Sequence, residues 1–81
     1  MEIKIYLNGG YFDGAQIMIP FHLQQFYVYA GDMINLYIVR PGEPCMPPTA
    51  DFLEGYSDTD MIVDAQSFEL TRTTRGVWHQ I

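Results

Sequence analysis

The first twenty residues constrain the fold more than any other part of the chain. Apolar side chains alternate with polar ones over residues 2–7 and again over residues 15–20, where a proline ends the second run. This period of two is typical of half-buried β-strands. Between the runs lie Asn8-Gly9-Gly10 and Asp13-Gly14, residue types that tolerate positive φ and can reverse the chain. The segment therefore predicts a β-hairpin, and it contains no catalytic signature.

Two further strand pairs follow from the same reasoning. Residues 24–30 and 33–40 are rich in aromatic and β-branched side chains, and Gly31-Asp32 stands between them, which predicts a second hairpin. The 33–40 segment carries almost no charge on either face, so we expect this strand to be central or covered on both sides. Residues 67–72 and 77–81 predict a last strand pair around a turn.

Residues 41–66 break this pattern. Four prolines fall within residues 41–48, and proline lacks the N–H that a strand donates to its neighbour. Residues 49–55 predict one helical turn, with Thr49 as its N-cap and Gly55 as its end, and residues 61–63 predict a short strand. A connection of this length inside a small domain is typical of a functional or mobile segment.

Length and composition indicate one small folded domain. The chain has 81 residues, of which 48% are apolar and 15% aromatic, which is too hydrophobic for a disordered chain. We therefore expect a single, mainly β domain over residues 1–81. Its predicted architecture is a small antiparallel sandwich or half-open barrel of five or six short strands, with at most one short helix.

Cysteine usage and the N-terminus predict a cytoplasmic protein. Cys45 is the single cysteine, so no intramolecular disulfide can form, and the chain suits a reducing compartment. The first residues lack the basic and continuous apolar regions of a secretory signal. The sequence contains no run of about 18 uninterrupted apolar residues, so we expect no membrane-spanning helix.

Charge is unevenly distributed along the chain. Ten acidic residues face four basic ones, for a net charge of −6, and no basic residue lies between Arg40 and Arg72. Such a field repels phosphates, which argues against direct nucleic-acid binding, and attracts basic surfaces. Two interpretations of the acidic segment stay open: a solvated loop that maintains solubility, or a docking surface for a basic partner. The candidate partner-binding residues are Asp51, Phe52, Glu54, Tyr56, Asp58 and Asp60.

Six tyrosines are many for a domain of this size. Tyr27 and Tyr29 share one strand face, opposite Phe26, Val28 and Ala30, so they form a candidate aromatic interface. Ordinary packing on a sheet is the alternative. Short strands and exposed tyrosines also predict a homo-oligomer that assembles through sheet edges or aromatic faces.

No residue pattern supports catalysis or metal binding. Three carboxylates lie within residues 58–64, but the glycine and terminal glutamate of a calcium loop are not in the required places. Cys45 stands among prolines with no neighbouring cation to lower its pKa, so it is a poor nucleophile for His22 or His79 to activate. We therefore expect no catalytic residue, no metal and no cofactor.

The chain resembles a group of short, uncharacterised bacteriophage and prophage proteins. The resemblance lies in Gly9-Gly10-Tyr11-Phe12-Asp13-Gly14 between two strands, the second ending at Pro20, and in an aromatic-rich final hairpin containing Phe68-Glu69-Leu70 and Gly76-Val77-Trp78. It does not extend to the proline-rich, acidic middle. The resemblance implies an origin in a virus or mobile element.

Small acidic proteins of such origin resemble inhibitors of host defence, including anti-CRISPR proteins that occupy the nucleic-acid channels of their targets. The resemblance thus implies a non-enzymatic inhibitor that docks on a basic surface of a host defence protein. One alternative is an oligomeric sponge for a nucleotide immune signal, whose phosphates would contact Arg40, Arg72 or Arg75 from several subunits. A further alternative is a minor virion or assembly component.

Overall fold

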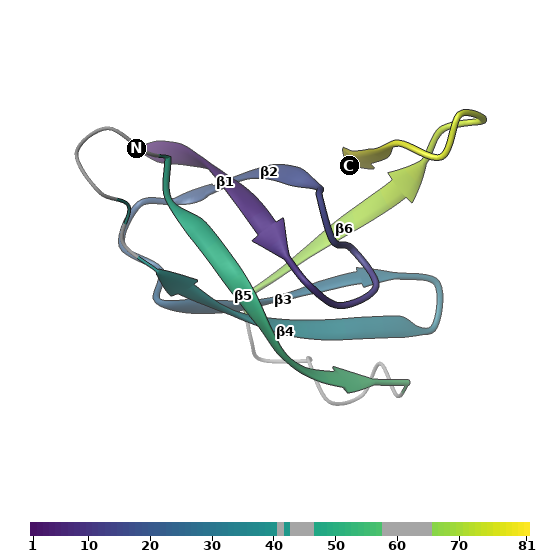
Figure 1. Cartoon of the computed structure of the whole chain (residues 1–81), viewed down its shortest axis with the longest axis horizontal. Coiled ribbons are helices and arrows are strands. Elements are labelled where there is room, and N and C mark those ends of the chain that lie inside the picture. Colours follow the sequence, from purple (N-terminus) through teal and green to yellow (C-terminus); the bar gives the residue numbers. More distant parts are fainter. Residues whose placement is uncertain (41, 43–46, 58–65) are drawn as a thin grey trace.

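The computed structural model describes residues 1–40, 42, 47–57 and 66–81, and these residues form strands and turns without a helix (Figure 1). The seven strands are β1 (Glu2–Asn8), β2 (Gln16–Pro20), β3 (Gln25–Ala30), β4 (Met33–Arg40), β5 (Thr49–Tyr56), β6 (Ser67–Arg72) and β7 (Trp78–Gln80). The prediction of a mainly β fold is confirmed, although five or six strands were expected.

The strands make one sheet in the order β2-β1-β5-β4-β3-β6-β7, which curls until its two edges, β2 and β7, approach each other (Figure 1). The result is a nearly closed, barrel-like sheet. All three predicted hairpins are present as antiparallel pairs, namely β1–β2, β3–β4 and β6–β7. The fourth strand is central as expected, because β4 lies between β3 and β5.

The expectation of an antiparallel sheet holds for four of the six strand pairs, β1–β2, β3–β4, β4–β5 and β6–β7, and is wrong for the other two. β1 pairs with β5 in parallel, and β3 pairs with β6 in parallel. These two contacts join the hairpins to strands that are distant in sequence. Alternation within a segment predicts that a strand forms, but it carries no information about which distant strand lies beside it.

The helical turn expected over residues 49–55 is also wrong, because these residues belong to β5. Thr49 faces Tyr6 of β1 on one side and Arg40 of β4 on the other. Residues 49–51 have a ladder on both edges, and the residues after them pair with β4. This pairing satisfies backbone groups of the segment, whereas a single isolated helical turn is unfavourable to nucleate. The strand expected over residues 61–63 lies outside the described residues.

The core lies on the concave side of the sheet, where the inward side chains of the strands meet. Phe12 comes from the loop between β1 and β2, and its side chain is completely buried. Its ring packs against Trp78 at 4.8 Å between centroids. The loop thus contributes a core residue and is not merely a connection.

Glycines and two polar side chains hold this loop in place. Gly9 and Gly10 have φ of +81° and +73°, which confirms that the glycines serve a turn. The buried Asn35 accepts a hydrogen bond from the Tyr11 backbone N–H at 2.7 Å. The Tyr37 hydroxyl donates to the Gly9 carbonyl at 2.8 Å. β4 therefore fixes the loop through two side chains that its inner face presents.

Candidate functional site

A group of tyrosines and carboxylates lies on the outer face of the sheet, opposite the core. In β3, Phe26 and Val28 are buried in the core, so Tyr27 and Tyr29, which alternate with them, point outward, as the geometry of a strand requires. Tyr27 and Tyr29 thus share one face of β3, and their role as an interface stays a prediction. Directly paired residues on neighbouring strands share a face, so the register identifies the other members.

The register extends this face over four strands. Tyr27 pairs with Leu36, which pairs with Glu54. Tyr29 has Ile34 on one side, which pairs with Tyr56, and Glu69 on the other. We call this surface the tyrosine face. Its members are Tyr27, Tyr29, Ile34, Leu36, Glu54, Tyr56 and Glu69, of which Ile34 and Leu36 are buried.

The tyrosines of this face contact one another and a carboxylate. The rings of Tyr27 and Tyr56 lie 6.2 Å apart between centroids, and the Tyr56 hydroxyl donates to the Glu54 carboxylate. That hydrogen bond raises the pKa of Tyr56, because it stabilises the protonated phenol. Glu54 and Glu69 are exposed, so carboxylates stand on β5 and β6, on either side of the tyrosines.

A β-bulge in β5 decides which acidic residues reach this face. Phe52 faces Tyr37 and Glu54 faces Leu36, so that Leu53 is the extra residue. Strict alternation would place Asp51 and Glu54 on opposite faces, but one inserted residue puts both on the outer face. Phe52 points the other way, with its ring 6.1 Å from that of Tyr37. The structure thus separates Phe52 from the carboxylates with which it was grouped.

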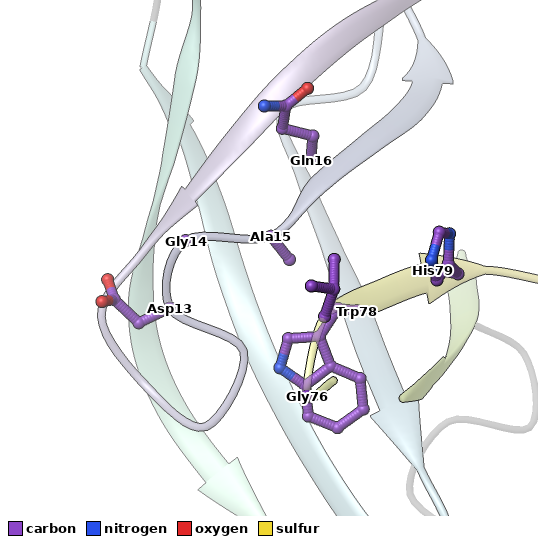
Figure 2. Close-up of a pocket in the computed structure, with 8 residues that line it drawn as sticks. Asp13, Gly14, Ala15, Gln16, Gly76, Trp78 and His79 are labelled. Carbon is purple, nitrogen blue, oxygen red and sulfur yellow. The ribbon is translucent and has the colours of Figure 1, made fainter. Parts of the chain in front are cut away.

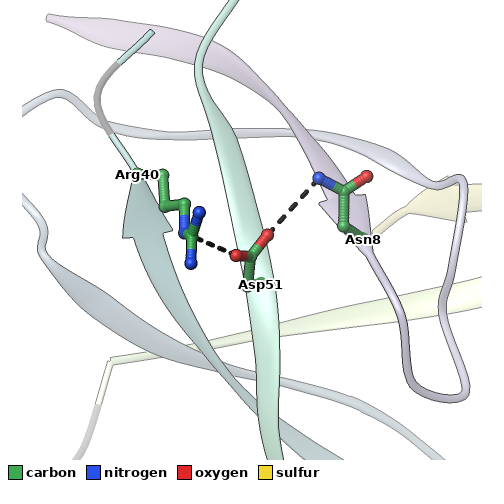
Figure 3. Close-up of polar contacts among 3 residues, drawn as sticks. All are labelled: Asn8, Arg40 and Asp51. Atoms are coloured by element: carbon green, nitrogen blue, oxygen red, sulfur yellow. Dashed lines mark hydrogen bonds and ion pairs between the residues drawn. The ribbon is translucent and has the colours of Figure 1, made fainter.

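Asp51 forms an ion pair with Arg40 (Figure 3). The Arg40 Nε lies 2.6 Å from the Asp51 Oδ2, and Asn8 Nδ2 donates to Oδ1 at 3.4 Å. Sequence reasoning had assigned Asp51 to a basic partner and Arg40 to an anion. Their mutual contact partly neutralises both, so Glu54 and Glu69 become the stronger candidates for electrostatic steering.

The other two arginines lie elsewhere in the fold. The Arg72 guanidinium lies 4.5 Å from the centroid of the Trp78 ring and 5.6 Å from that of Tyr11. Arg75 lies in the turn between β6 and β7, where its backbone N–H donates to Thr73 Oγ1 at 3.3 Å. One chain therefore does not gather Arg40, Arg72 and Arg75 into a phosphate site.

A cavity of about 500 Å³ opens between the two edges of the sheet (Figure 2). Its lining includes Ala15 and Gln16 at the start of β2, Trp78 and His79 on β7, and Asp13 in the loop. Sequence reasoning missed this groove, because it arises from the strand order. A second cavity, of about 520 Å³, is mostly apolar, with Phe21 and Leu23 from the segment after β2 and Val39 of β4 in its lining.

The expectations that the chain has no metal and no catalytic residue stay predictions. Within residues 1–40, 42, 47–57 and 66–81, no three His, Cys, Asp or Glu side chains form a metal-binding group. Cys45 and the carboxylates within residues 58–64, including Asp58 and Asp60, lie outside the described residues. His22 and His79 line different cavities, His22 the apolar one and His79 the groove between the sheet edges.

Comparison with models of protein families, with curated proteins and with solved structures gave no match for this chain. Among the residues that the structure describes, none belongs to a helix with the length and apolar character needed to cross a membrane. Functional inference therefore depends on the geometry of the surfaces described above.

Proposed function

We propose that this chain is a non-enzymatic binding protein of phage or mobile-element origin. Its partner in this proposal is a basic surface of a host defence protein in the host cytoplasm, and the tyrosine face is the surface that docks. The observation that supports this proposal is the collection of Tyr27, Tyr29 and Tyr56 on one outer sheet face between Glu54 and Glu69.

The chemistry of the face suits a protein partner. Tyrosine offers a large, rigid contact area with a polar tip and loses little conformational entropy on binding. Carboxylates at the rim of such a surface steer association with a positively charged partner, and they act mainly on the association rate. The net charge of −6 also attracts a positively charged partner at long range. The face thus combines anchoring and steering.

The same face is the candidate surface for self-association. Tyr27 and Tyr56 are only partly buried, so a second copy could cover them, and we propose that a homo-oligomer forms this way. Sedimentation equilibrium over a wide concentration range tests it. A single monomer mass throughout would contradict self-association and leave the face open for a different protein.

The main test is kinetic. A tagged copy expressed in its native host captures the partner, whose binding to purified chain is then measured by surface plasmon resonance at low and high salt. Replacing Glu54 and Glu69 together by Gln should slow association severalfold and flatten the salt dependence, because loss of two rim charges weakens steering. Tyr27→Ala should instead accelerate dissociation, because a tyrosine in the centre of an interface is a typical hot spot.

Glu2→Gln is the matched control, because Glu2 is an exposed carboxylate on β1, away from the tyrosine face. This variant should associate at close to the wild-type rate. If the double neutralisation behaves like Glu2→Gln while Arg72→Ala abolishes binding, the docking proposal is wrong. A nucleotide or another anionic ligand then becomes the better explanation.

A further inference from the structure

We propose that the seam between β2 and β7 binds an extended peptide segment of a partner protein, which enters as an additional strand antiparallel to both edges. The proposal concerns a surface other than the tyrosine face. It depends on the backbone groups that the two edge strands turn toward the seam, on the side chain that bridges these strands and on the directions in which they run.

The edge of β2 presents backbone groups to the seam. Leu7 N–H donates to Ala15 O, and Phe21 N–H donates to Met1 O. With the register of the β1–β2 pair, these bonds show that odd-numbered residues of β2 bond to β1. In an antiparallel strand the intervening residues turn their N–H and C=O groups to the other side. Gln16 and Met18 therefore direct their peptide groups into the seam.

The edge of β7 does the same from the opposite side. Thr73 N–H donates to Val77 O, and Ile81 N–H donates to Glu69 O, so odd-numbered residues of β7 bond to β6. Trp78 and Gln80 thus direct their peptide groups toward β2. Exposed peptide groups on an edge strand are a template for pairing with another chain.

A side chain already occupies the position of a strand at one point of the seam. Met18 N–H donates to Gln80 Oε1 at 2.8 Å, and Gln80 Nε2 donates to Met18 O at 2.9 Å. One amide thereby satisfies both backbone groups of Met18, as a residue of a paired antiparallel strand would. At this point the seam offers the hydrogen bonds of a strand site, although Cα atoms of β2 and β7 lie within 8 Å of each other, less than the two spacings of about 4.8 Å that an inserted strand takes up. The peptide therefore has to displace the Gln80 side chain and widen the seam, starting from the cavity of about 500 Å³ beside Gln16 and Trp78.

The strand directions favour insertion over direct closure. Following the pairings around the sheet, β2 and β7 run the same way, as Figure 1 also shows. Direct closure would make one parallel pair. A strand inserted in the opposite direction makes two antiparallel pairs, which are slightly more stable per residue.

The geometry selects a single peptide segment as the occupant. The edge strand of a second folded copy brings its own neighbouring strand, which would collide with β2 or β7 on the far side of the groove. An isolated extended segment has no such neighbour. Peptide recognition by addition of a strand takes affinity from main-chain hydrogen bonds and specificity from alternate side chains. The alternate inward side chains meet Ala15 and Trp78, so they should be apolar, and the outward ones should be basic because the chain is acidic.

The test uses a capped hexapeptide of alternating lysine and valine as the probe, with ¹⁵N-labelled full-length chain. Titration should shift the backbone amide signals of Gln16, Met18 and Trp78, and should slow hydrogen exchange at Gln16 and Trp78. An analogue with glutamate in place of lysine should bind more weakly, and an analogue that is N-methylated at alternate residues should lose most of its affinity. The N-methyl groups remove the strand's donors without changing its side chains.

Two variants and one control test the roles of the edges. Gln80→Ala should strengthen peptide binding about fivefold, because the two hydrogen bonds to Met18 no longer compete with the peptide. Gln16→Pro should weaken it about two- to tenfold, because it removes one seam donor. Proline is tolerated where an edge N–H faces away from the sheet. Asp32→Asn, which alters an exposed side chain in the turn between β3 and β4 and leaves the lining of the seam intact, should leave the affinity unchanged.

Three results would overturn the proposal. One is the absence of amide shifts at millimolar peptide. Another is a set of shifts confined to the tyrosine face. The third is equal binding of the parent and N-methylated peptides. This comparison uses the wild-type chain, so it tests the proposal even if Gln16→Pro fails to fold.

Discussion

Gly10→Ala is expected to destabilise this fold strongly, because position 10 has neither the backbone conformation nor the space for a side chain. Gly10 has φ of +73°. A Cβ built there would lie 2.5 Å from Phe52 Cδ1 and 2.6 Å from Asn35 Oδ1. Asn35 is buried and holds the Tyr11 backbone N–H, so it cannot move aside without losing that hydrogen bond.

The magnitude has two parts. A left-handed backbone conformation costs an alanine about 1–2 kcal/mol relative to glycine. Forcing an extra methyl group into a packed site costs about 1–3 kcal/mol more, so the variant should lose about 2–5 kcal/mol. A chain of this size has a free energy of unfolding of about 4–12 kcal/mol. Each lost kcal/mol lowers the melting temperature of a domain this small by about 4–8 °C.

Gly14→Ala is the matched control. Gly14 has φ of +87°, and a Cβ added there would have no atom within 4 Å of it, so this variant should lose only the conformational part, about 1–2 kcal/mol. Urea denaturation followed by Trp78 fluorescence and by circular dichroism measures both variants. Adding Phe52→Ala to Gly10→Ala should recover part of the difference. If Gly10→Ala and Gly14→Ala unfold at the same urea concentration, the steric argument is refuted.

Two further predictions concern single contacts. Tyr37→Phe removes the hydrogen bond to Gly9 O and should cost about 1 kcal/mol. Burial, assisted by the Asp13 carboxylate and opposed by a hydrogen bond from the Phe12 backbone, raises the pKa of Tyr37 from 10.0 to about 12. The stability linked to this shift is therefore present below pH 10 and lost as the pH rises toward 12, a decline that denaturation curves should show to be smaller in Tyr37→Phe. Arg72→Ala should cost about 0.5–1 kcal/mol of cation–π energy with Trp78, whereas Arg75→Ala should cost nothing measurable by the same assay.

The hairpins were predictable because their signals are local. Residues 2–20 contain alternating strands and turn glycines within one short segment, and the same holds for residues 25–40. Each half of such a pair is adjacent in sequence to its partner. Loop length and turn residues then fix the register with no reference to the rest of the chain.

β5 was not predictable in this way. Its alternation is interrupted by the bulge at Leu53, and Gly55 within it is unfavourable in an isolated strand. What makes it a strand is the pair of neighbours, β1 and β4, that flank its first residues. A segment whose structure depends on distant partners carries little evidence of that structure in its own composition.

The candidate site likewise combines features that local sequence predicts with features that depend on distant strands. Alternation alone predicted that Tyr27 and Tyr29 share one face, since this depends only on β3. Placing Tyr56 and Glu54 beside them required the register of β4 with β5. Glu69 was not selected from the sequence, although the burial of Leu70 next to it reflects an alternation that was visible there. The missing information was that β6 lies beside β3.

The strand order also separates the two proposed surfaces. The tyrosine face extends over β5, β4, β3 and β6, whereas the seam is formed by β2 and β7 at the two ends of the same sheet. A ligand in the seam contacts backbone edges, and a partner on the tyrosine face contacts side chains of central strands. Gln80 belongs to the first surface and Tyr27 to the second, with no described contact between them. Because interactions at distant, independent sites are close to additive, binding at one surface should survive the loss of the other, and a chain that used both could hold two segments of one target at once.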